Sequence, residues 1–361
     1  MKSEPRIAFV IDSLPSVGGG ERVLFTALEI FPHADIFTLV YNSEYFTQTP
    51  IAHKKIRTSF INSLPFAHKY HRFFLPLMPH AIEQFDLCGY DGIVCFSYAV
   101  AHGVVHQNGS RHVSYTYTPM RYAWTDINLN GTHTRKNLLL NRFMNAFRKW
   151  DKEAASRVHA FAAISQAISQ RIADAYERSA PVIYPPVDVA RFRPSQQREN
   201  FYITVSRLVP HKRMDVIVQA FARLGLPLLV IGDGHELPRL QSMAASNIKF
   251  LGYESDEKVA ELLGKARGFV CASEEDFGIA IVEAQAAGCP VIAFGKGGAL
   301  ETVVDGATGV FFPEQSVPSL IEAVSRFEQR ATDFDVNTIT QNVQRFGKQR
   351  FKDEFRKFVE G

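Results

Sequence analysis

The stretch Glu-Asp-Phe-Gly-Ile-Ala-Ile-Val-Glu at residues 275–283, followed by Ala-Gln-Ala-Ala-Gly-Cys-Pro-Val-Ile-Ala at 284–293, is the most informative part of the chain. Its apolar, alanine-rich part predicts a helix that a glycine and a proline end before a new strand begins. A strand, a loop, a helix and a further strand place Glu275 and Glu283 at the carboxyl edge of a parallel sheet, where open α/β folds bind ligands. Two carboxylates beside a helix N-terminus can hold the hydroxyls of a ligand while the helix end holds its phosphate.

Strands and helices alternate on both sides of this stretch. The Pro-rich segment Ala-Pro-Val-Ile-Tyr-Pro-Pro-Val-Asp (180–188) separates two such series as a stiff connector. Strands are predicted at 6–11, 36–41, 90–96, 112–116 and 160–164 before the connector, and at 201–206, 227–232, 248–251, 268–272 and 290–294 after it. Helices are predicted to begin near Glu21 and at Ser165, and to span 213–224, 256–266 and 281–287. The pattern predicts an α/β protein with two doubly wound domains.

The composition is that of an ordinary globular protein. The 361 residues suit two domains of about 180 residues each, with 46% hydrophobic and 21% charged residues. A net charge of +3 is too small to imply nucleic acid by itself. The four cysteines form no Cys-x-x-Cys pair and no metal spacing, which fits a reducing cytoplasm. No run approaches 18 apolar residues, so no membrane span is expected, and the first apolar run is too short for a signal peptide.

A second charged motif is predicted at the same sheet edge as the two glutamates. Ser-Arg-Leu-Val-Pro-His-Lys-Arg (206–213) lies where a predicted strand ends and a helix begins. Four potential cations at one edge repel each other unless an anion is bound. Arginine can grip a diphosphate with two parallel hydrogen bonds, and lysine adds a compact charge. A solvated cation cluster is the alternative, and the acidic pair at the same edge makes it less favourable.

Residues 275–283 resemble the Glu-x7-Glu signature of family 4 of the retaining glycosyltransferases, which have the two-Rossmann-domain GT-B fold. The resemblance implies that Glu275 reaches the transferred sugar and that Glu283 holds the ribose hydroxyls of a nucleotide sugar. It also places the loop and helix start between them on the donor side, and the residues concerned are Phe277, Gly278 and Ile279. An isolated Glu-x7-Glu would more often be a pair of solvated acids at a helix start. The surrounding Phe-Gly, Glu-Ala and Gly-Cys-Pro-Val context favours the signature.

Further segments match the same family in the same order along the chain. Arg207 and Lys212 match its Arg-x4-Lys pair, which implies that they hold the donor diphosphate. Val-Gly-Gly-Gly-Glu-Arg (17–22) is similar to the family's Gly-Gly-Ala-Glu-Arg loop, so Gly18 and Gly19 are implied to face the donor phosphates or sugar. Gly232 is expected to let the chain pass close to the nucleotide. For the first loop alone, a tight strand-to-helix turn is the alternative.

The segment 115–124, Tyr-Thr-Tyr-Thr-Pro-Met-Arg-Tyr-Ala-Trp, resembles one in bacterial members of the family that contains His-Thr-Pro. Tyr117 stands where that histidine is expected. A tyrosine hydroxyl can hydrogen-bond a sugar hydroxyl, but it is not a base at neutral pH. Tyr117, Arg121 and Tyr122 are candidates for the acceptor side, and buried aromatic packing is the alternative.

Two stretches without Asp or Glu, 45–82 and 127–150, interleave Lys and Arg with aromatic residues. Such a pattern suits an anionic membrane surface, or a phosphorylated lipid acceptor. A solvated basic face over a packed aromatic core is an equal alternative. The near-neutral total charge disfavours single-stranded nucleic acid.

Together these features predict a GT-B glycosyltransferase with two Rossmann-like domains facing a central cleft. The expected domains are an acceptor domain at 1–182, a nucleotide-sugar domain at 183–345, and a C-terminal helix at 346–361 that crosses back to the N-terminal domain. The resemblance implies a cytoplasmic enzyme, peripheral on the inner face of the membrane, that moves a hexose from a nucleotide sugar to a lipid-linked glycan of surface polysaccharides. It favours GDP-mannose, with no further cofactor, no metal and no nucleic acid. A UDP- or ADP-sugar transferase, a nucleotide-sugar epimerase or hydrolase, and a non-catalytic binder are the alternatives.

Overall fold

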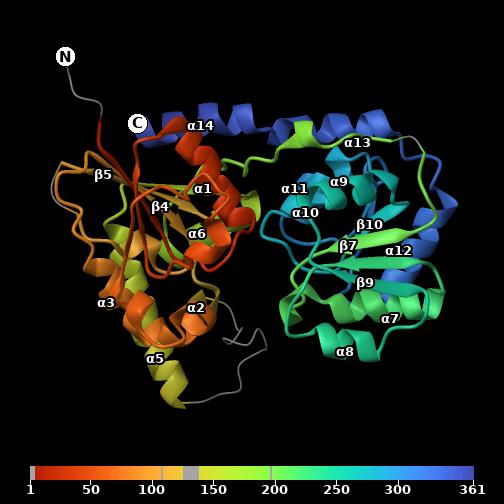
Figure 1. The fold of residues 1–361 in the computed structure, drawn as a ribbon, viewed down its shortest axis with the longest axis horizontal. Coiled ribbons are helices and arrows are strands. Elements are labelled where there is room, and N and C mark those ends of the chain that lie inside the picture. Colours follow the sequence, from red (N-terminus) through yellow and green to blue (C-terminus); the bar gives the residue numbers. More distant parts are fainter. Residues whose placement is uncertain (1–4, 107–108, 125–137, 196) are drawn as a thin grey trace. The chain divides into compact units, whose positions relative to one another are not determined.

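A computed structural model describes residues 5–106, 109–124, 138–195 and 197–361, and these form two α/β units (Figure 1). Unit 1 consists of residues 1–186 together with 351–361, and unit 2 of residues 187–350. Each unit has a six-stranded sheet in which every neighbouring pair of strands is parallel. The predicted fold class, an α/β protein with two Rossmann-like domains, is confirmed.

The sheet of unit 1 has the strand order β3-β2-β1-β4-β5-β6, which is the dinucleotide-fold order. Its strands are β1 (Ile7–Ile11), β2 (Asp35–Thr38), β3 (Ile56–Thr58), β4 (Gly92–Ser97), β5 (Arg111–Thr116) and β6 (Ala160–Ala163). Its helices are α1 (Gly19–Ile30), α2 (Ala67–Tyr70), α3 (Met78–Glu83), α4 (Arg121–Trp124), α5 (Leu138–Ser156) and α6 (Gln166–Tyr176). The predicted strand at 36–41 is shorter than expected, and β3 was not predicted.

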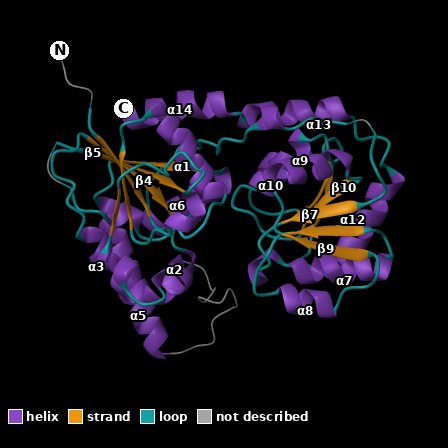
Figure 2. Cartoon of the chain, in the orientation of Figure 1, coloured by secondary structure: helices purple, strands orange, loops and turns teal. Residues whose placement is uncertain are grey.

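Unit 2 repeats the same strand order as β12-β11-β10-β7-β8-β9. Its strands are β7 (Tyr202–Val205), β8 (Leu228–Ile231), β9 (Ile248–Gly252), β10 (Gly268–Cys271), β11 (Val291–Phe294) and β12 (Gly309–Phe312). Its helices are α7 (Met214–Leu224), α8 (Leu237–Ser242), α9 (Asp256–Lys265), α10 (Ile279–Ala286), α11 (Ala299–Thr302), α12 (Val317–Gln329) and α13 (Val336–Val343). Helices α9 and α10 cover one face of the sheet, and α7 covers the other (Figure 2). Both faces are therefore apolar, and β10 and β11 are buried along their whole length.

The last helix, α14 (Lys348–Glu360), ends in unit 1. Phe355 stacks on Phe96 of β4 with ring centroids 5.8 Å apart, and Phe351 lies edge-on to Tyr115 of β5. Lys352 forms an ion pair with Glu29 of α1. The predicted return of the C-terminal helix to the N-terminal domain is confirmed.

In a sheet of this order, ligands bind where the direction of strand addition reverses, beyond the carboxyl ends of the two central strands. In unit 1 this switch point lies between β1 and β4, and the protein itself fills it. The Asp12 carboxylate, directly after β1, accepts hydrogen bonds from four successive backbone N–H groups after β4, those of residues 98–101, at 2.5–3.0 Å. In unit 2 the switch point lies between β7 and β10, and the loops there carry the predicted donor residues.

No helix among the described residues is both long and apolar enough to cross a membrane. The described residues also contain no cluster of three or more His, Cys, Asp or Glu arranged to hold a metal ion.

Candidate donor site

The loop after β7 carries Arg207 and Lys212 and is held in place by backbone hydrogen bonds to the loop after β8. The N–H of Ser206 donates to Ile231 O at 3.0 Å, and the N–H of Leu208 donates to Asp233 O at 2.9 Å. Because backbone hydrogen bonds hold the loop in place, its side chains are not needed to stabilise it and are available to contact a ligand or other residues. Arg207 is exposed, and its guanidinium makes no hydrogen bond or ion pair with any residue that the structure describes.

Gly232 and Gly234 make this close approach of the two loops possible. A Cβ atom on Gly232 would lie 1.9 Å from Ser206 O, and one on Gly234 would lie 2.2 Å from Leu208 O. Both glycines also have positive φ angles, 129° and 158°. A glycine is therefore required at position 232 by the fold itself, because any side chain there would collide with the loop that carries Arg207. The predicted approach of Gly232 to a nucleotide stays a prediction.

Glu275 lies in the loop after β10, on the neighbouring central strand, and it pairs with Lys212. The ammonium Nζ lies 2.7 Å from Oε1 and 2.9 Å from Oε2 of the carboxylate, so the two oxygens share one cation. The hydroxyl of Ser273 donates to the same Oε1. Both charged side chains are half-buried. The sequence thus placed two residues 63 positions apart at one sheet edge, and the structure brings their charged groups into contact.

A glycine pair that the sequence analysis missed supports the backbone of Glu275. Gly298 donates its N–H to Glu275 O at 2.7 Å, and Gly297 pairs with Glu275 as an isolated bridge. A Cβ on Gly297 would lie 2.4 Å from Glu275 O, and one on Gly298 would lie 2.4 Å from the Cα of Phe277. The signal in the sequence was Gly-Lys-Gly-Gly at 295–298.

Helix α10 begins at this loop and points its N-terminus to the same edge. Gly278 precedes the helix with φ 93°, and the first turn contains no acidic residue. Both Ile281 and Val282 donate to Gly278 O, and the helix dipole favours an anion at its start. The Phe277 ring is buried and lies edge-on to Phe346, at 5.3 Å between centroids. Any contact of Phe277, Gly278 or Ile279 with a donor would therefore come mainly from the backbone.

Glu283 lies further along α10, and Arg191 holds its carboxylate. One guanidinium nitrogen of Arg191 lies 2.8 Å from Glu283 Oε1, and the other lies 2.8 Å from Asp256 Oδ2 at the start of α9. The third nitrogen, Nε, is buried and has no hydrogen-bond partner in the described part of the chain. The sequence analysis missed Arg191, which lies just after the Pro-rich connector, because both carboxylates are far from it along the chain.

In unit 1, Gly18 precedes α1, and Gly19 is the first residue of that helix. Tyr117 follows β5 and donates its hydroxyl to Gly20 O at 2.8 Å. A Cβ on residue 20 would lie 3.4 Å from the Tyr117 ring. The two departures from the family pattern, Gly20 for alanine and Tyr117 for histidine, therefore pack against each other. Burial raises the pKa of Tyr117 well above its usual value, so its hydroxyl stays protonated at neutral pH.

The remaining acceptor candidates lie in α4. Arg121 is its first residue and is half-buried. Tyr122 is in the same short helix, and its side chain lies outside the described residues. The first part of the predicted basic stretch at 127–150, with Arg135 and Lys136, also lies outside them.

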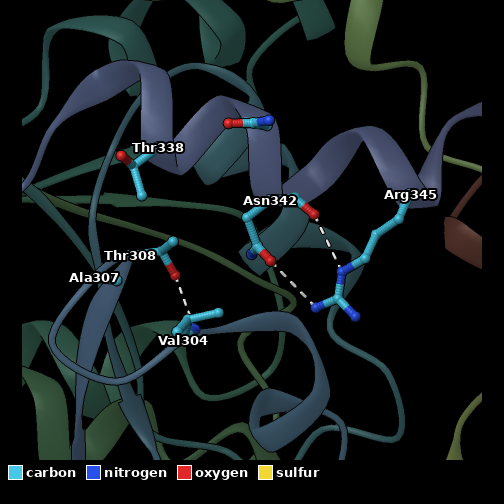
Figure 3. A pocket seen from close by; sticks show the side chains of 7 residues that line it. Val304, Ala307, Thr308, Thr338, Asn342 and Arg345 are labelled. Atoms are coloured by element: carbon cyan, nitrogen blue, oxygen red, sulfur yellow. Dashed lines mark hydrogen bonds between the residues drawn. The ribbon is translucent and has the colours of Figure 1, made fainter.

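Unit 2 also has a cavity of about 300 Å³, which Figure 3 shows from close by. It lies between α13 and the segment before β12. Arg345 and Asn342 in its wall hydrogen-bond to each other, and Arg345 also donates to Glu301 O at 2.6 Å. It contains none of the predicted site residues, and its lining is Val304, Ala307, Thr308, Thr338, Gln341, Asn342 and Arg345.

Residues 189–343, almost all of unit 2, match the family model described as glycosyl transferases group 1. The chain is 32% identical over 194 residues to a GDP-mannose-dependent alpha-(1-6)-phosphatidylinositol monomannoside mannosyltransferase of Mycobacterium tuberculosis, covering 45% of this chain and 50% of that protein. It is 32% identical over 203 residues to a GDP-mannose-dependent monoacylated alpha-(1-6)-phosphatidylinositol monomannoside mannosyltransferase of Corynebacterium glutamicum, covering 47% and 53%. The matched region thus spans about half of each curated relative.

Solved structures share the fold over the whole chain. The Anabaena protein HepE, in complex with UDP and glucose, superimposes with a TM-score of 0.72 at 18% identity, covering 99% of this chain and 100% of that one. Sucrose-phosphate synthase from Thermosynechococcus elongatus superimposes with a TM-score of 0.78 at 16% identity, covering 98% of each chain.

Proposed function

We propose that this chain, in which residues 189–343 match the family model of the group 1 glycosyl transferases, transfers a hexose from a nucleotide sugar to a glycan acceptor. The observation that carries the proposal is the arrangement at the switch point of unit 2. There Arg207, the Lys212–Glu275 pair and the N-terminus of α10 come from the two central strands. Cations, a carboxylate and a helix N-terminus are the groups that a sugar diphosphate requires.

Each group has a proposed part in binding the donor. Arg207, whose guanidinium has no partner among the described residues, grips the diphosphate, and Lys212 bridges that diphosphate and Glu275. Glu275 accepts a hydrogen bond from the hexose, and Glu283 accepts hydrogen bonds from the ribose hydroxyls. The backbone at Gly278 and Ile279 binds phosphate oxygens. Gly18 and Gly19, with Tyr117, Arg121 and Tyr122, are proposed to contact the donor phosphates and the acceptor from unit 1.

The proposed reaction retains the configuration of the sugar. The bond between the sugar C1 and the diphosphate oxygen breaks, and the acceptor oxygen forms a new bond to C1 on the same face. The proton of the acceptor hydroxyl goes to the departing diphosphate. Arg207 and Lys212 stabilise the charge that grows on this leaving group. Tyr117 takes no proton, because its raised pKa keeps it neutral.

GDP-mannose is the proposed donor, and a lipid-linked glycan of surface polysaccharide is the proposed acceptor. The names of the mycobacterial and corynebacterial relatives support this choice, since both are GDP-mannose-dependent. A UDP- or ADP-sugar is the second candidate, and the UDP bound to the HepE structure favours it. A nucleotide-sugar epimerase or hydrolase is a further alternative, and it would differ from a transferase by consuming the donor when no acceptor is present. We place the enzyme at the inner face of the cytoplasmic membrane, as a peripheral protein.

The first test is the thermal stability of the protein with UDP, GDP, ADP and NAD. At 100 times its dissociation constant, the correct nucleotide stabilises the protein by about 2.7 kcal/mol and raises the melting temperature of unit 2 by roughly 5–10 °C. GDP is expected to give this shift, and Arg207→Ala to remove most of it. Lys249→Ala is the control, because Lys249 is exposed on β9 and is outside the proposed site. Equal behaviour of the two variants, or no shift with any nucleotide, would contradict the donor site.

Arg191 is predicted to position Glu283 for the ribose. In Arg191→Ala the Glu283 carboxylate loses its 2.8 Å contact, so we expect the dissociation constant of the nucleotide to rise about tenfold, or ~1.4 kcal/mol. Arg191→Lys should recover only part of this loss, because one ammonium cannot bridge two carboxylates as a guanidinium does.

The measurement is the ratio of affinities for the nucleotide and its 2′,3′-dideoxy form, by calorimetry. The wild-type protein should prefer the ribonucleotide, and Arg191→Ala should lose most of that preference. If Arg191→Ala binds both forms more weakly by the same factor, Arg191 acts on the fold and not on ribose recognition.

A further inference from the structure

Unit 1 exposes an unusual number of large apolar side chains within one short segment. Phe66, Tyr70 and Phe73 are 76%, 45% and 65% exposed, and Phe60 and Leu77 nearby are also exposed. Five of the eleven large exposed hydrophobic residues of the described chain thus fall within residues 60–77. Exposed apolar side chains scattered singly are normal, whereas a contiguous group marks a surface that binds something. We call Phe66, Tyr70 and Phe73 the aromatic ridge.

The ridge is continuous. The rings of Phe66 and Tyr70 lie 6.5 Å apart between centroids, those of Tyr70 and Phe73 lie 6.1 Å apart, and both pairs are edge-to-face. Phe66 directly precedes α2, Tyr70 is the last residue of α2, and Phe73 lies in the 3₁₀ helix His71–Leu77 that follows. The opposite side of the same segment is buried in the core of unit 1 through Ala67 and Leu75. The exposed rings are therefore carried by a segment that the core anchors.

The backbone of Phe66 is held in a conformation that a phenylalanine rarely adopts. Phe66 has φ 59° and ψ 15°, in the left-handed region that favours glycine or asparagine. Its carbonyl accepts hydrogen bonds from the N–H groups of Lys69 at 3.1 Å and Tyr70 at 2.9 Å, so the conformation is fixed by the turn. A phenylalanine in this backbone conformation destabilises the fold, and because the Phe66 side chain is exposed, packing contacts offset little of that cost. Strain of this kind, at an exposed side chain, indicates a function for that side chain.

The charged residues of the segment that carries the ridge are all basic. The chain has no Asp or Glu from residue 45 to residue 82. Lys69 and Arg72 are exposed within the ridge segment, and the Lys69 ammonium lies 5.3 Å from the centroid of the Tyr70 ring. Aromatic rings flanked by cations are complementary to a binding partner that has an apolar interior and anionic groups at its surface. The interface of an anionic lipid bilayer has this chemistry, since aromatic side chains settle at the headgroup level and Lys and Arg attract anionic lipids.

We propose that the aromatic ridge inserts into the interface of an anionic bilayer, with Lys69 and Arg72 binding the headgroups. The inference deepens the proposed function, because it names the surface by which this transferase would reach a lipid-linked acceptor. Single-stranded nucleic acid is a different occupant, which the experiment below also tests.

The test is co-sedimentation of the whole chain with vesicles of phosphatidylcholine, either pure or containing about 30 mol% phosphatidylglycerol. Binding is expected to the anionic vesicles, and to weaken with salt. The double variant Phe66→Asn/Phe73→Ser should partition at least tenfold more weakly, and Lys69→Gln or Arg72→Gln about fivefold each. Tyr45→Ser is the matched control, because Tyr45 is a 59% exposed aromatic residue of unit 1 outside the ridge.

Phe66→Asn separates binding from folding. Asparagine tolerates the left-handed conformation, so this change should leave the melting temperature unchanged or raise it, while vesicle binding falls. The proposal is overturned if the ridge variants bind vesicles as well as Tyr45→Ser does, or if the protein binds a single-stranded RNA probe and no vesicles. The nucleotide-induced thermal shift is independent of this result, so failure of the ridge and failure of the donor site can be told apart.

Discussion

Glu275→Gln is expected to lower kcat for sugar transfer by on the order of 100-fold or more, with a smaller change in nucleotide affinity. The carboxylate is held by Lys212 at 2.7 and 2.9 Å and by the Ser273 hydroxyl, so its position is fixed before any substrate arrives. Glutamine offers one oxygen instead of two and no charge. It would remove the negative charge that balances the half-buried Lys212 ammonium, whose charge would then be balanced by the diphosphate alone. Initial rates at saturating donor, with the acceptor varied, measure the effect.

Glu274→Gln is the matched control for this prediction. Glu274 is the preceding acid of the same loop and pairs with Lys296 at 3.1 Å, nearer the surface. Because surface ion pairs contribute little, this variant should keep its rate within about twofold. If Glu275→Gln and Arg207→Ala both keep normal rates, transfer does not take place at the carboxyl edge of unit 2.

Asp12→Ala is expected to destabilise unit 1 by about 4 kcal/mol. The buried carboxylate accepts four backbone N–H groups at 2.5–3.0 Å, and alanine would leave these buried donors without acceptors. Burial raises the pKa of Asp12 above its usual value, and the four N–H donors, which lower it, offset only part of that rise. Asp12→Asn keeps one acceptor oxygen and should lose about half as much, roughly 2 kcal/mol.

Urea unfolding followed by tryptophan fluorescence measures this loss in unit 1 specifically. The chain has two tryptophans, Trp124 and Trp150, and both belong to unit 1. Asp174→Ala is the control, because Asp174 is exposed on α6, and a change within about 0.5 kcal/mol is expected. Equal stabilities of the Asp12 and Asp174 variants would show that the four hydrogen bonds do not stabilise the fold.

The sequence predicted the parts of the fold that depend on long apolar runs. The ten strands expected from such runs all appear, and the helix expected at 213–224 is α7, which begins one residue later. Two strands were missed. β3 has three residues, follows two lysines and pairs on one side only, as a charged edge strand does. β12 follows a turn signal and is also at a sheet edge. Short edge strands leave little periodicity in a sequence.

The site was predictable where residues of one loop share a motif, and not where contacts join distant segments. Arg207, Lys212, Glu275 and Glu283 were found from local patterns, and their roles stay predictions. Arg191 was missed because no local pattern relates it to carboxylates 65 and 92 residues away. The packing of Tyr117 on Gly20 was missed for the same reason, since the two are 97 residues apart. Contacts of this kind depend on the register of strands, which a single sequence does not state.

The return of α14 to unit 1 has a consequence for the order in which the protein is made. The stacking of Phe355 on Phe96, and the bond from the Arg111 guanidinium to Val359 O at 3.0 Å, need residues that the ribosome adds after all of unit 2. At about 5–20 residues per second, the synthesis of unit 2 takes roughly 10–30 s. During that interval the nascent unit 1 has an uncovered aromatic surface on β4 and β5. Unit 2, although later in the chain, is therefore the first unit whose core can be complete.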